Sequence, residues 1–217
     1  MEIVSTKDIK KVIEVLEKGG IVCGPTDTIY GLLADATNRE AVERLYSLRR
    51  SSDKPFIVLL PDISYIEGVF DIRVSGLGTA LLLLGVTVIF PKRTTIPTYL
   101  TRWRKSIALR VPRKGVFITT LLKRFGKPLV APSANPEGLP PAVDIKEAME
   151  YFGDKVDLYV RGAKLTGKPS TIVRLISNKT IKIVREGNIS KEEIIDFLKG
   201  PEDIEPEILL NPFSFDF

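Results

Sequence analysis

GGIVCGPTDTIYGLLADATN (residues 19–38) places three small polar side chains between two apolar runs, and this interruption decides how the fold is understood. The first run, residues 21–24, predicts a buried strand. It leads directly into Pro-Thr-Asp-Thr at 25–28, and apolar residues resume at Ile29. Such a tetrapeptide is typical of a turn, because Thr and Asp close turns and cap helices. It could instead form the polar floor of a ligand site, where Gly31 would allow close approach.

The composition limits the class of protein. The chain has 217 residues, 44% of them hydrophobic and 27% charged, which predicts one fairly large soluble domain, with two as the outer limit. No apolar run approaches the roughly 18 residues that a membrane helix needs, and the N-terminus lacks the order of a signal peptide. The single cysteine, Cys23, excludes an internal disulfide framework and is expected to be buried. We expect a cytoplasmic protein without membrane contact.

The chain contains no histidine. This excludes a Ser-His-Asp triad and, with one cysteine, a Cys/His zinc site within one chain. Any chemistry must therefore use hydroxyls, carboxylates, Lys, Arg, backbone donors or a carboxylate-held magnesium ion. We assign no residue as a ligand of a resident metal.

The distribution of charge is uneven. The net charge is +5, yet residues 72–136 contain no Asp or Glu and twelve Lys or Arg. A stretch with one sign of charge suggests a field directed at an anion, such as a nucleotide or a nucleic acid. Chance clustering in a mildly basic protein is the alternative. Residues 201–217 are the reverse, with five acids and no base, and predict a flexible or docking tail that is acidic and aromatic.

Local patterns predict alternating strands and helices. The expected helices cover 7–18, a segment capped by Asn38, 116–125, and two segments opened by the capping boxes Asp144/Glu147 and Ser190/Glu193. The expected strands cover 55–61, 85–91, 106–112 and 128–133, with a hairpin around 178–179. This interleaving predicts one α/β (α+β) domain with a mixed sheet over residues 1–200.

Small hydroxyl or basic residues follow several of the apolar strands. They occur in PTDTIYG (25–31), ALRVP (108–112), APSAN (131–135) and GKPSTIV (167–173), with RRSSDKP (49–55) nearby. Ligand sites of α/β sheets lie at strand ends, so these segments together predict one site.

In the same order, the segments GPTDTIYGLLADATN, DKPFIVLL, SIALRVP, PLVAPSANPEGLPP, GKPSTIV and IVREG resemble the YrdC-like threonylcarbamoyl-AMP synthase family, here in a single-domain form. The resemblance covers roughly residues 5–200. It implies a twisted mixed sheet with flanking helices around a basic cavity. It also implies a reaction in which L-threonine, bicarbonate and ATP, with Mg²⁺ carried on the ATP, give threonylcarbamoyl-adenylate and pyrophosphate for tRNA modification.

The resemblance also implies roles for individual residues. The substrate-binding residues would be Thr26, Thr28, Arg110, Ala131 and Ser170. The nucleotide-binding residues would be Arg50, Lys54, Ser106, Ser133, Asn135 and Arg185, of which Arg50 and Lys54 would also be catalytic. The alternative for each basic residue is a solvated surface charge, and for the two serines Ser133 and Ser170 a cap or turn.

One segment departs from the family pattern. SLRRSSDKP is one residue shorter than usual, with Arg49 at the position of a lysine and Ser51 at that of a proline. These changes resemble the paralogous YciO-like branch, so the alternative function is binding of tRNA or double-stranded RNA with weak or no synthesis. The basic loop 93–105 around Trp103 would close over ATP as a lid, or else contact tRNA. The oligomeric state is not predicted.

Overall fold

The structure, a computed structural model, describes residues 1–49, 54–199 and the strand at 207–210. Among these residues, eleven strands form one mixed sheet in the order β1-β8-β2-β3-β7-β4-β6-β5-β9-β10-β11. The strands are β1 (Glu2–Ser5), β2 (Val22–Pro25), β3 (Tyr30–Asp35), β4 (Val58–Leu59), β5 (Thr87–Pro91), β6 (Ser106–Arg110), β7 (Leu129–Val130), β8 (Leu158–Arg161), β9 (Ile172–Leu175), β10 (Thr180–Arg185) and β11 (Glu207–Leu210).

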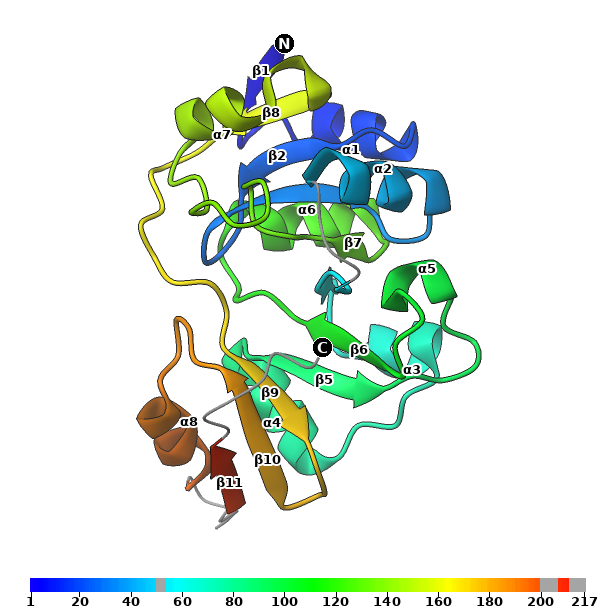
Figure 1. Ribbon diagram of the computed structural model, residues 1–217, viewed down its shortest axis with the longest axis vertical. Helices are drawn as coiled ribbons and strands as arrows, with labels where there is room; N and C mark the ends of the chain where they lie inside the picture. Colours follow the sequence, from blue (N-terminus) through cyan, green and yellow to red (C-terminus); the bar gives the residue numbers. More distant parts are fainter. Residues whose placement is uncertain (50–53, 200–206, 211–217) are drawn as a thin grey trace.

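Helices flank this sheet in both halves of the molecule (Figure 1). They are α1 (Ile9–Glu17), α2 (Arg39–Arg49), α3 (Ser64–Phe70), α4 (Gly76–Leu84), α5 (Thr98–Thr101), α6 (Phe117–Phe125), α7 (Ile145–Phe152) and α8 (Lys191–Leu198), with a 3₁₀ turn η1 (Gly153–Lys155). The predicted α/β fold with a twisted mixed sheet is confirmed. None of the helices in the described chain is long and apolar enough to cross a membrane.

The sheet is narrow at its centre. The upper half in Figure 1 holds β1, β8, β2 and β3, and the lower half holds β6, β5, β9 and β10. The two-residue strands β7 and β4 join the halves. The strand predicted at 55–61 is shortened to β4. Before it begins, Phe56 stacks on Tyr46 with ring centroids 3.9 Å apart, and the Phe56 backbone N–H donates to the Tyr46 hydroxyl at 3.1 Å. The strand predicted at 128–133 is likewise reduced to β7.

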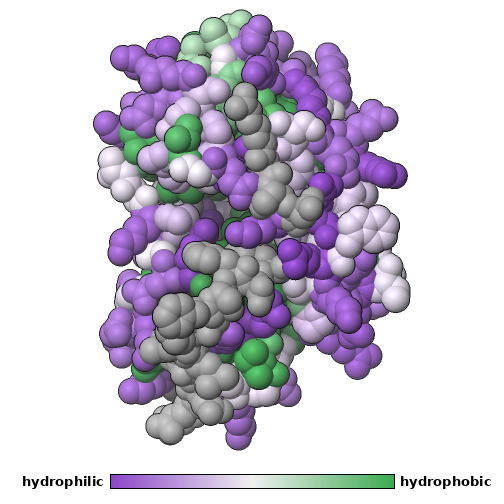
Figure 2. Space-filling view, in the orientation of Figure 1, coloured by the Kyte–Doolittle hydropathy of each residue, from purple (hydrophilic) through white to green (hydrophobic). Residues whose placement is uncertain are grey.

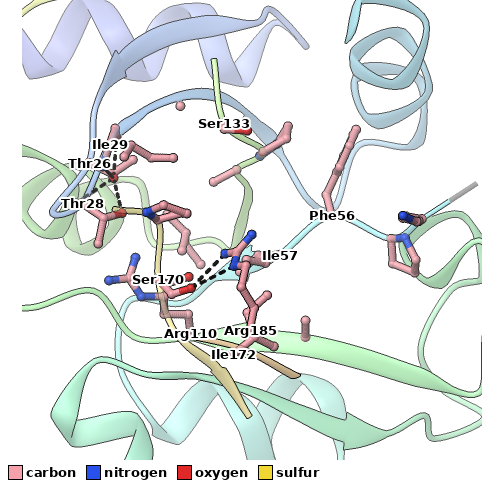
Figure 3. A pocket seen from close by; sticks show the side chains of 18 of the residues that line it. Thr26, Thr28, Ile29, Phe56, Ile57, Arg110, Ser133, Ser170, Ile172 and Arg185 are labelled. Carbon is pink, nitrogen blue, oxygen red and sulfur yellow. Dashed lines mark hydrogen bonds between the residues drawn. The ribbon is translucent and has the colours of Figure 1, made fainter. Parts of the chain in front are cut away.

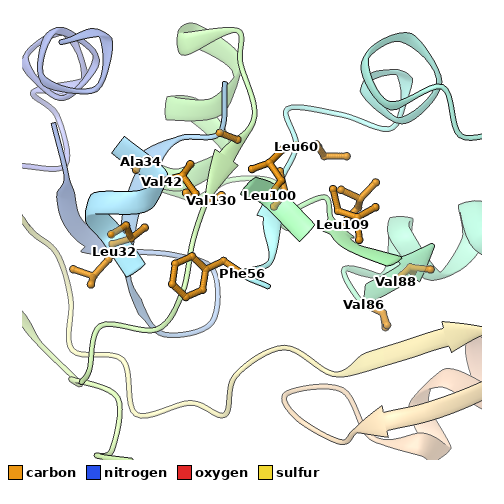
Figure 4. Packing of buried hydrophobic residues seen from close by; sticks show 14 of the residues in the cluster. Leu32, Ala34, Val42, Phe56, Leu60, Val86, Val88, Leu100, Leu109 and Val130 are labelled. Carbon is orange, nitrogen blue, oxygen red and sulfur yellow. The ribbon is translucent and has the colours of Figure 1, made fainter. Parts of the chain in front are cut away.

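One buried hydrophobic cluster runs through both halves. Figure 4 shows Leu32 and Ala34 of β3 continuing through Val130 and Leu60 to Leu109 of β6. A second cluster lies under α1 and α6, which pack against each other. Burial of this apolar area stabilises the arrangement at roughly 25 cal/mol per Å². The continuous core therefore fixes the two halves relative to each other on either side of the short central strands.

The predicted helix caps are largely present. Asn38 Oδ1 accepts from Ala41 N at 3.1 Å, and Ser190 forms the full capping box with Glu193. Asp144 Oδ1 accepts from the Glu147 backbone N–H at 3.0 Å, but the Glu147 carboxylate accepts from Val143 N instead of returning to Asp144. Each cap contributes about 1 kcal/mol, so these local signals set where the helices begin.

The C-terminal part of the sheet comes from a predicted hairpin and from the predicted tail. β9 and β10 pair antiparallel around residues 176–179, which confirms the hairpin. β11 then adds to β10 in parallel and belongs to the segment predicted as a tail. The rest of that tail lies outside the described residues, and the proposed domain boundary at residue 200 stays a prediction.

Candidate active site

A cavity of about 270 Å³ lies between the two halves, next to the short central strands. The molecular surface is hollowed between the halves (Figure 2), and Figure 3 shows the side chains that meet there. Eight of the predicted site residues line it: Thr26, Thr28, Lys54, Arg110, Ala131, Ser133, Ser170 and Arg185. The fold thus brings together residues that lie up to 159 positions apart in the sequence, namely Thr26 and Arg185.

The Pro-Thr-Asp-Thr stretch is both a turn and a cavity floor. The Thr26 hydroxyl donates to Ile29 O at 2.7 Å and accepts from the backbone N–H groups of Thr28 and Ile29 at 3.1 and 3.2 Å. These bonds occupy the Thr26 hydroxyl, which therefore shapes the turn. Among the described residues, the Thr28 hydroxyl has one hydrogen-bond partner, Thr26 Oγ1 at 3.2 Å. Thr28 is thus the threonine of the pair whose hydroxyl can bond a ligand.

Gly31 allows a second loop to pass directly behind this floor. Gly31 lies opposite Ser133 in an isolated antiparallel bridge, whose hydrogen bonds run from Leu32 N to Pro132 O and from Ala134 N to Tyr30 O, both at 2.9 Å. A Cβ at Gly31 would lie 3.3 Å from Pro132 O and 3.2 Å from Thr26 Cγ2, closer than ordinary side-chain packing. Glycine at this position therefore brings the APSAN loop into the cavity wall, as the sequence predicted.

Arg110 and Asp27 form a buried ion pair at the cavity wall. Arg110 Nη2 donates to Asp27 Oδ2 at 2.8 Å, with side chains only 3% and 2% exposed. Arg110 Nε donates to Gly85 O at 2.9 Å, and Asp27 Oδ2 also accepts from Arg113 N at 2.9 Å. Burial lowers the pKa of the Arg110 guanidinium, and the Asp27 carboxylate opposes that shift. Asp27 Oδ1 is buried and has no hydrogen-bond partner among the described residues.

A second guanidinium lies beside the first. Arg185 donates through Nε and Nη2 to Ser170 O at 3.3 and 2.9 Å, as the dashed lines of Figure 3 mark. Burial, and then the positive charge of Arg110, lower the pKa of Arg185 to about 10, so Arg185 remains protonated at neutral pH. The Ser170 hydroxyl contacts Thr87 Oγ1 at 2.8 Å. One buried and one half-buried cation make this end of the cavity suited to an anionic ligand.

The opposite wall is held by Arg49, at the end of α2. Its Nε donates to Ser133 O and Asn135 O at 3.2 and 3.0 Å, and its Nη2 donates to Ser133 Oγ at 3.2 Å. The guanidinium carbon lies 5.9 Å from the centroid of the Phe56 ring. Burial lowers the pKa of Arg49. A lysine could not make this planar fork of bonds, so Arg49 positions the Ser133 loop.

Two predicted site residues are absent from the described lining, and a third is not among the described residues. Ser106 does not belong to the described cavity lining. Asn135 also lies behind the lining, where its Nδ2 donates to Pro136 O and Leu139 O at 2.9 and 2.7 Å and shapes the loop. Arg50 lies outside the described residues.

The sequence did not assign Arg49, Asp27, Phe56 or Glu137 to the site. Arg49, Phe56 and Glu137 line the cavity, and Asp27 holds Arg110. The available signal for Arg49 was its place at the departure from the family pattern, and for Asp27 it was a carboxylate within PTDTIYG. Cys23, in contrast, is buried as predicted, and its burial raises its pKa to about 12.

The basic loop predicted as a lid lies away from the cavity. None of residues 92–105 belongs to the described lining. Arg102 instead pairs with Glu43 of α2 at 2.9 Å and lies over the Tyr46 ring, 4.3 Å from its centroid. Arg102 is therefore committed to α2, and closure of the loop over ATP stays a prediction.

Comparison with known proteins decides the family. A family model named for Sua5, YciO and YrdC, with the description "Telomere recombination", matches residues 14–187. The chain belongs to the Sua5/YciO/YrdC family. The resemblance noted from its sequence motifs is thereby confirmed.

Several curated relatives of the chain are named threonylcarbamoyl-AMP synthase. The threonylcarbamoyl-AMP synthase of Coxiella burnetii is 30% identical over 183 residues, which cover 82% of this chain and 98% of that protein. The enzyme of the same name from Marinobacter nauticus is 32% identical over 76% of this chain and 89% of its own. The Bacillus subtilis one is 29% identical, and the match covers 88% of this chain but 57% of that protein.

Solved structures of the family share the fold. Pyrococcus abyssi Sua5 complexed with L-threonine aligns with a TM-score of 0.84 at 24% identity, over 98% of this chain and 63% of that one. E. coli YciO aligns with a TM-score of 0.74 at 26% identity, over 86% of this chain and 94% of that one. This chain thus spans less than two thirds of the Sua5 chain and nearly all of YciO.

Proposed function

We propose that this chain is an L-threonylcarbamoyladenylate synthase and a nucleotidyltransferase. It would form threonylcarbamoyl-AMP and pyrophosphate from L-threonine, bicarbonate and ATP, as a step of tRNA threonylcarbamoyladenosine modification in the cytoplasm. The observation that carries the proposal is the pair of neighbouring guanidinium groups, buried Arg110 and half-buried Arg185, in a cavity that also offers the Thr28 and Ser170 hydroxyls. The names of the relatives that are about 30% identical support it.

The reaction asks the protein for charge neutralisation more than for proton transfer. The threonine amine and bicarbonate combine to a carbamate with loss of water. A carbamate oxygen then attacks the α-phosphorus of ATP, the bond between the α- and β-phosphates breaks, and pyrophosphate leaves with its electron pair. Two anions must approach each other, so preorganised cations lower the barrier. A cavity with Arg and Lys and without histidine suits this task.

Threonine would bind between the PTDTIYG floor and the two guanidinium groups. The Arg110 Nη1 group makes no hydrogen bond to described residues, so it can receive the threonine carboxylate. Thr28 and Ser170 would bond the remaining polar groups, and the Ala131 backbone would contact the substrate. Thr26 would act indirectly, since its hydroxyl is occupied in holding the turn that carries Thr28.

ATP would lie along the wall that carries Ser133. Lys54 is exposed at the cavity and would contact the phosphates, together with Arg50 and Arg185. Ser133 would bond the nucleotide, while Asn135 would act by shaping its loop. Ser106 remains a proposed nucleotide contact that lies outside the described lining.

Magnesium would arrive with ATP. The described cavity lining holds one carboxylate, Glu137, and the nearby Asp27 is committed to Arg110. Within the described chain, no three His, Cys, Asp or Glu side chains lie close enough to hold a metal ion. The residues therefore fit an ion held mainly by phosphate oxygens, whose role is to neutralise phosphate charge.

The proposal is tested by incubating the purified protein with ATP, threonine, bicarbonate and magnesium and measuring pyrophosphate. Release should require threonine and bicarbonate together. The control omits each in turn and replaces threonine with valine, which lacks the hydroxyl. ATP turnover that is indifferent to both would contradict the proposal.

A second function is favoured by one departure in the sequence. The RRSSDKP segment departs from the synthase pattern, and E. coli YciO aligns over 86% of this chain and 94% of its own. An RNA-binding protein with weak or no synthesis would show RNA affinity without threonine-dependent pyrophosphate release. The assay above separates the two.

A further inference from the structure

The connection between β5 and β6, residues 92–105, is anchored on one side and open on the other. α5 lies within it and packs on α2, and the Tyr99 hydroxyl donates to Ala36 O at 3.0 Å. Arg102 adds its ion pair with Glu43 and its contact with the Tyr46 ring. These contacts hold the base of the connection, while its outer residues take no part in the cavity.

Cations gather on this open side. We define the basic surface by five cations and one tryptophan: Arg73, Lys92, Arg93, Trp103, Arg104 and Lys105. Four of the cations are exposed, and Lys92 is half-buried. None of the five forms an ion pair with a described residue. Lys92 N donates to Lys105 O at 2.8 Å, so the backbone sets these two lysines side by side.

Part of the basic surface is concave. A groove of about 340 Å³ is lined by Arg73, Lys92 and Arg93 and by the hairpin tip of β9 and β10, including Ser177 and Asn178. Its described lining contains no carboxylate. Unpaired cations around a groove produce a positive potential that attracts a polyanion.

Trp103 is displayed rather than packed. Its side chain is 83% exposed, the largest exposure among the large hydrophobic side chains of the described chain. Arg102 and Trp103 have successive left-handed backbone conformations, with φ of 47° and 65°. Residues other than glycine seldom adopt this conformation, and here the two contacts of Arg102 hold it in place. The ring is thus presented to solvent on a fixed turn.

We propose that the basic surface binds single-stranded RNA, with phosphates on the cations and a base stacked on Trp103. A basic groove combined with an exposed aromatic ring is the arrangement that binds single strands with little sequence preference. The surface is separate from the cavity, so the proposal extends the function to a second site. The choice of RNA over DNA rests on the proposed function, whereas the location of the site does not.

The cations are tested by fluorescence anisotropy with a labelled oligouridylate of about 12 nucleotides across a salt series. The variant combines Arg73→Ala, Arg93→Ala, Arg104→Ala and Lys105→Ala. The matched control removes four exposed lysines from the other half of the molecule: Lys7→Ala, Lys10→Ala, Lys18→Ala and Lys123→Ala. Each lost phosphate contact lowers the salt slope by about 0.7. The variant should therefore lose roughly 3 from the slope and at least about tenfold in affinity, and the control should lose neither.

The tryptophan is tested separately. Trp103→Ala should weaken binding roughly 5- to 150-fold at an unchanged salt slope, and Trp103→Phe should retain most of the affinity. Thermal melts confirm that each variant is folded, and threonine-dependent pyrophosphate release should stay at the wild-type rate. That readout tests the proposed function by itself, because RNA affinity is measured without ATP or threonine.

Several results would overturn the proposal. An equal loss of RNA affinity in the four-lysine control variant would show that the total charge of the protein, and not this surface, binds RNA. Unchanged RNA binding in Trp103→Ala, with equal affinity for duplex RNA, would exclude stacking. Binding of anionic lipid vesicles that is lost in the variants, without RNA binding by the wild type, would assign the surface to a membrane.

Discussion

Replacing Asp27 with alanine should destabilise the protein far more than a typical surface change. Asp27→Ala leaves the Arg110 guanidinium, whose side chain is 3% exposed, without its carboxylate partner. Removing one member of a buried ion pair costs about 3–5 kcal/mol. For a domain of this size each kcal/mol lowers Tm by about 2–4 °C, which predicts a fall of roughly 6–20 °C. Thermal unfolding followed by circular dichroism and by intrinsic fluorescence measures it.

A double variant isolates the pair. Asp27→Ala with Arg110→Met removes both charges, so no buried charge remains uncompensated, and Gly85 O loses one bond worth about 1 kcal/mol. The double variant should be more stable than Asp27→Ala alone. It should also lose the rise in Tm that threonine produces and keep the rise that ATP produces, since Arg110 is proposed to hold the threonine carboxylate. If the losses of unfolding free energy in Asp27→Ala and in Arg110→Met add up to that of the double variant within about 0.5 kcal/mol, the two residues are not coupled. If the double variant loses the rise in Tm with ATP and keeps the rise with threonine, the assignment of the two subsites is reversed.

Three further outcomes follow from other parts of the fold. Gly187→Ala places a Cβ against the backbone that carries Ser170 and should cost about 1–3 kcal/mol in urea unfolding with reduced synthesis. Gly68→Ala lies inside α3, where a Cβ meets nothing within 4 Å, and should instead stabilise by about 0.5–1 kcal/mol; equal effects would contradict this. Cys23, with its pKa raised to about 12, should react with a thiol reagent at pH 8 only after unfolding, and rapid labelling of the native protein would disprove its burial. Burial raises the pKa of Asp157, but hydrogen bonds from an arginine of α2 and from a backbone N–H hold that pKa below its usual range. Asp157→Asn should therefore lower the free energy of unfolding by about 1 kcal/mol at pH 7, after solvent screening. The difference in stability between wild type and variant should shrink below about pH 4 as the wild-type carboxylate is protonated, and a difference that stays constant with pH would contradict this assignment.

The sequence allowed prediction of features that local chemistry controls. The Asn38 and Ser190 caps, the hairpin at 176–179 and the close approach at Gly31 each depend on a few neighbouring residues. The position of most site residues followed from a family resemblance, which the family model confirms at the level of membership.

Features that depend on distant partners escaped prediction. Asp27 and Arg110 are 83 positions apart, so no local pattern indicates that the first holds the second. The apolar run 55–61 has the composition of a full strand, yet Phe56 at its start is bound to Tyr46 of α2 and the strand has two residues. The charge of loop 93–105 suggested a lid, and no local pattern indicated that Arg102 pairs with Glu43 of α2. In each case a tertiary contact decided between alternatives that composition left equal.

The most direct test of the proposed synthase is the fate of the carbon atom of bicarbonate. The protein is incubated with ATP, threonine, magnesium and bicarbonate labelled at carbon, and the nucleotide products are separated by chromatography. We predict label in a single adenylate that also contains threonine, formed in equal amount with pyrophosphate and absent when threonine is omitted. Pyrophosphate, AMP or ADP formed without labelled carbon in any nucleotide would contradict the account.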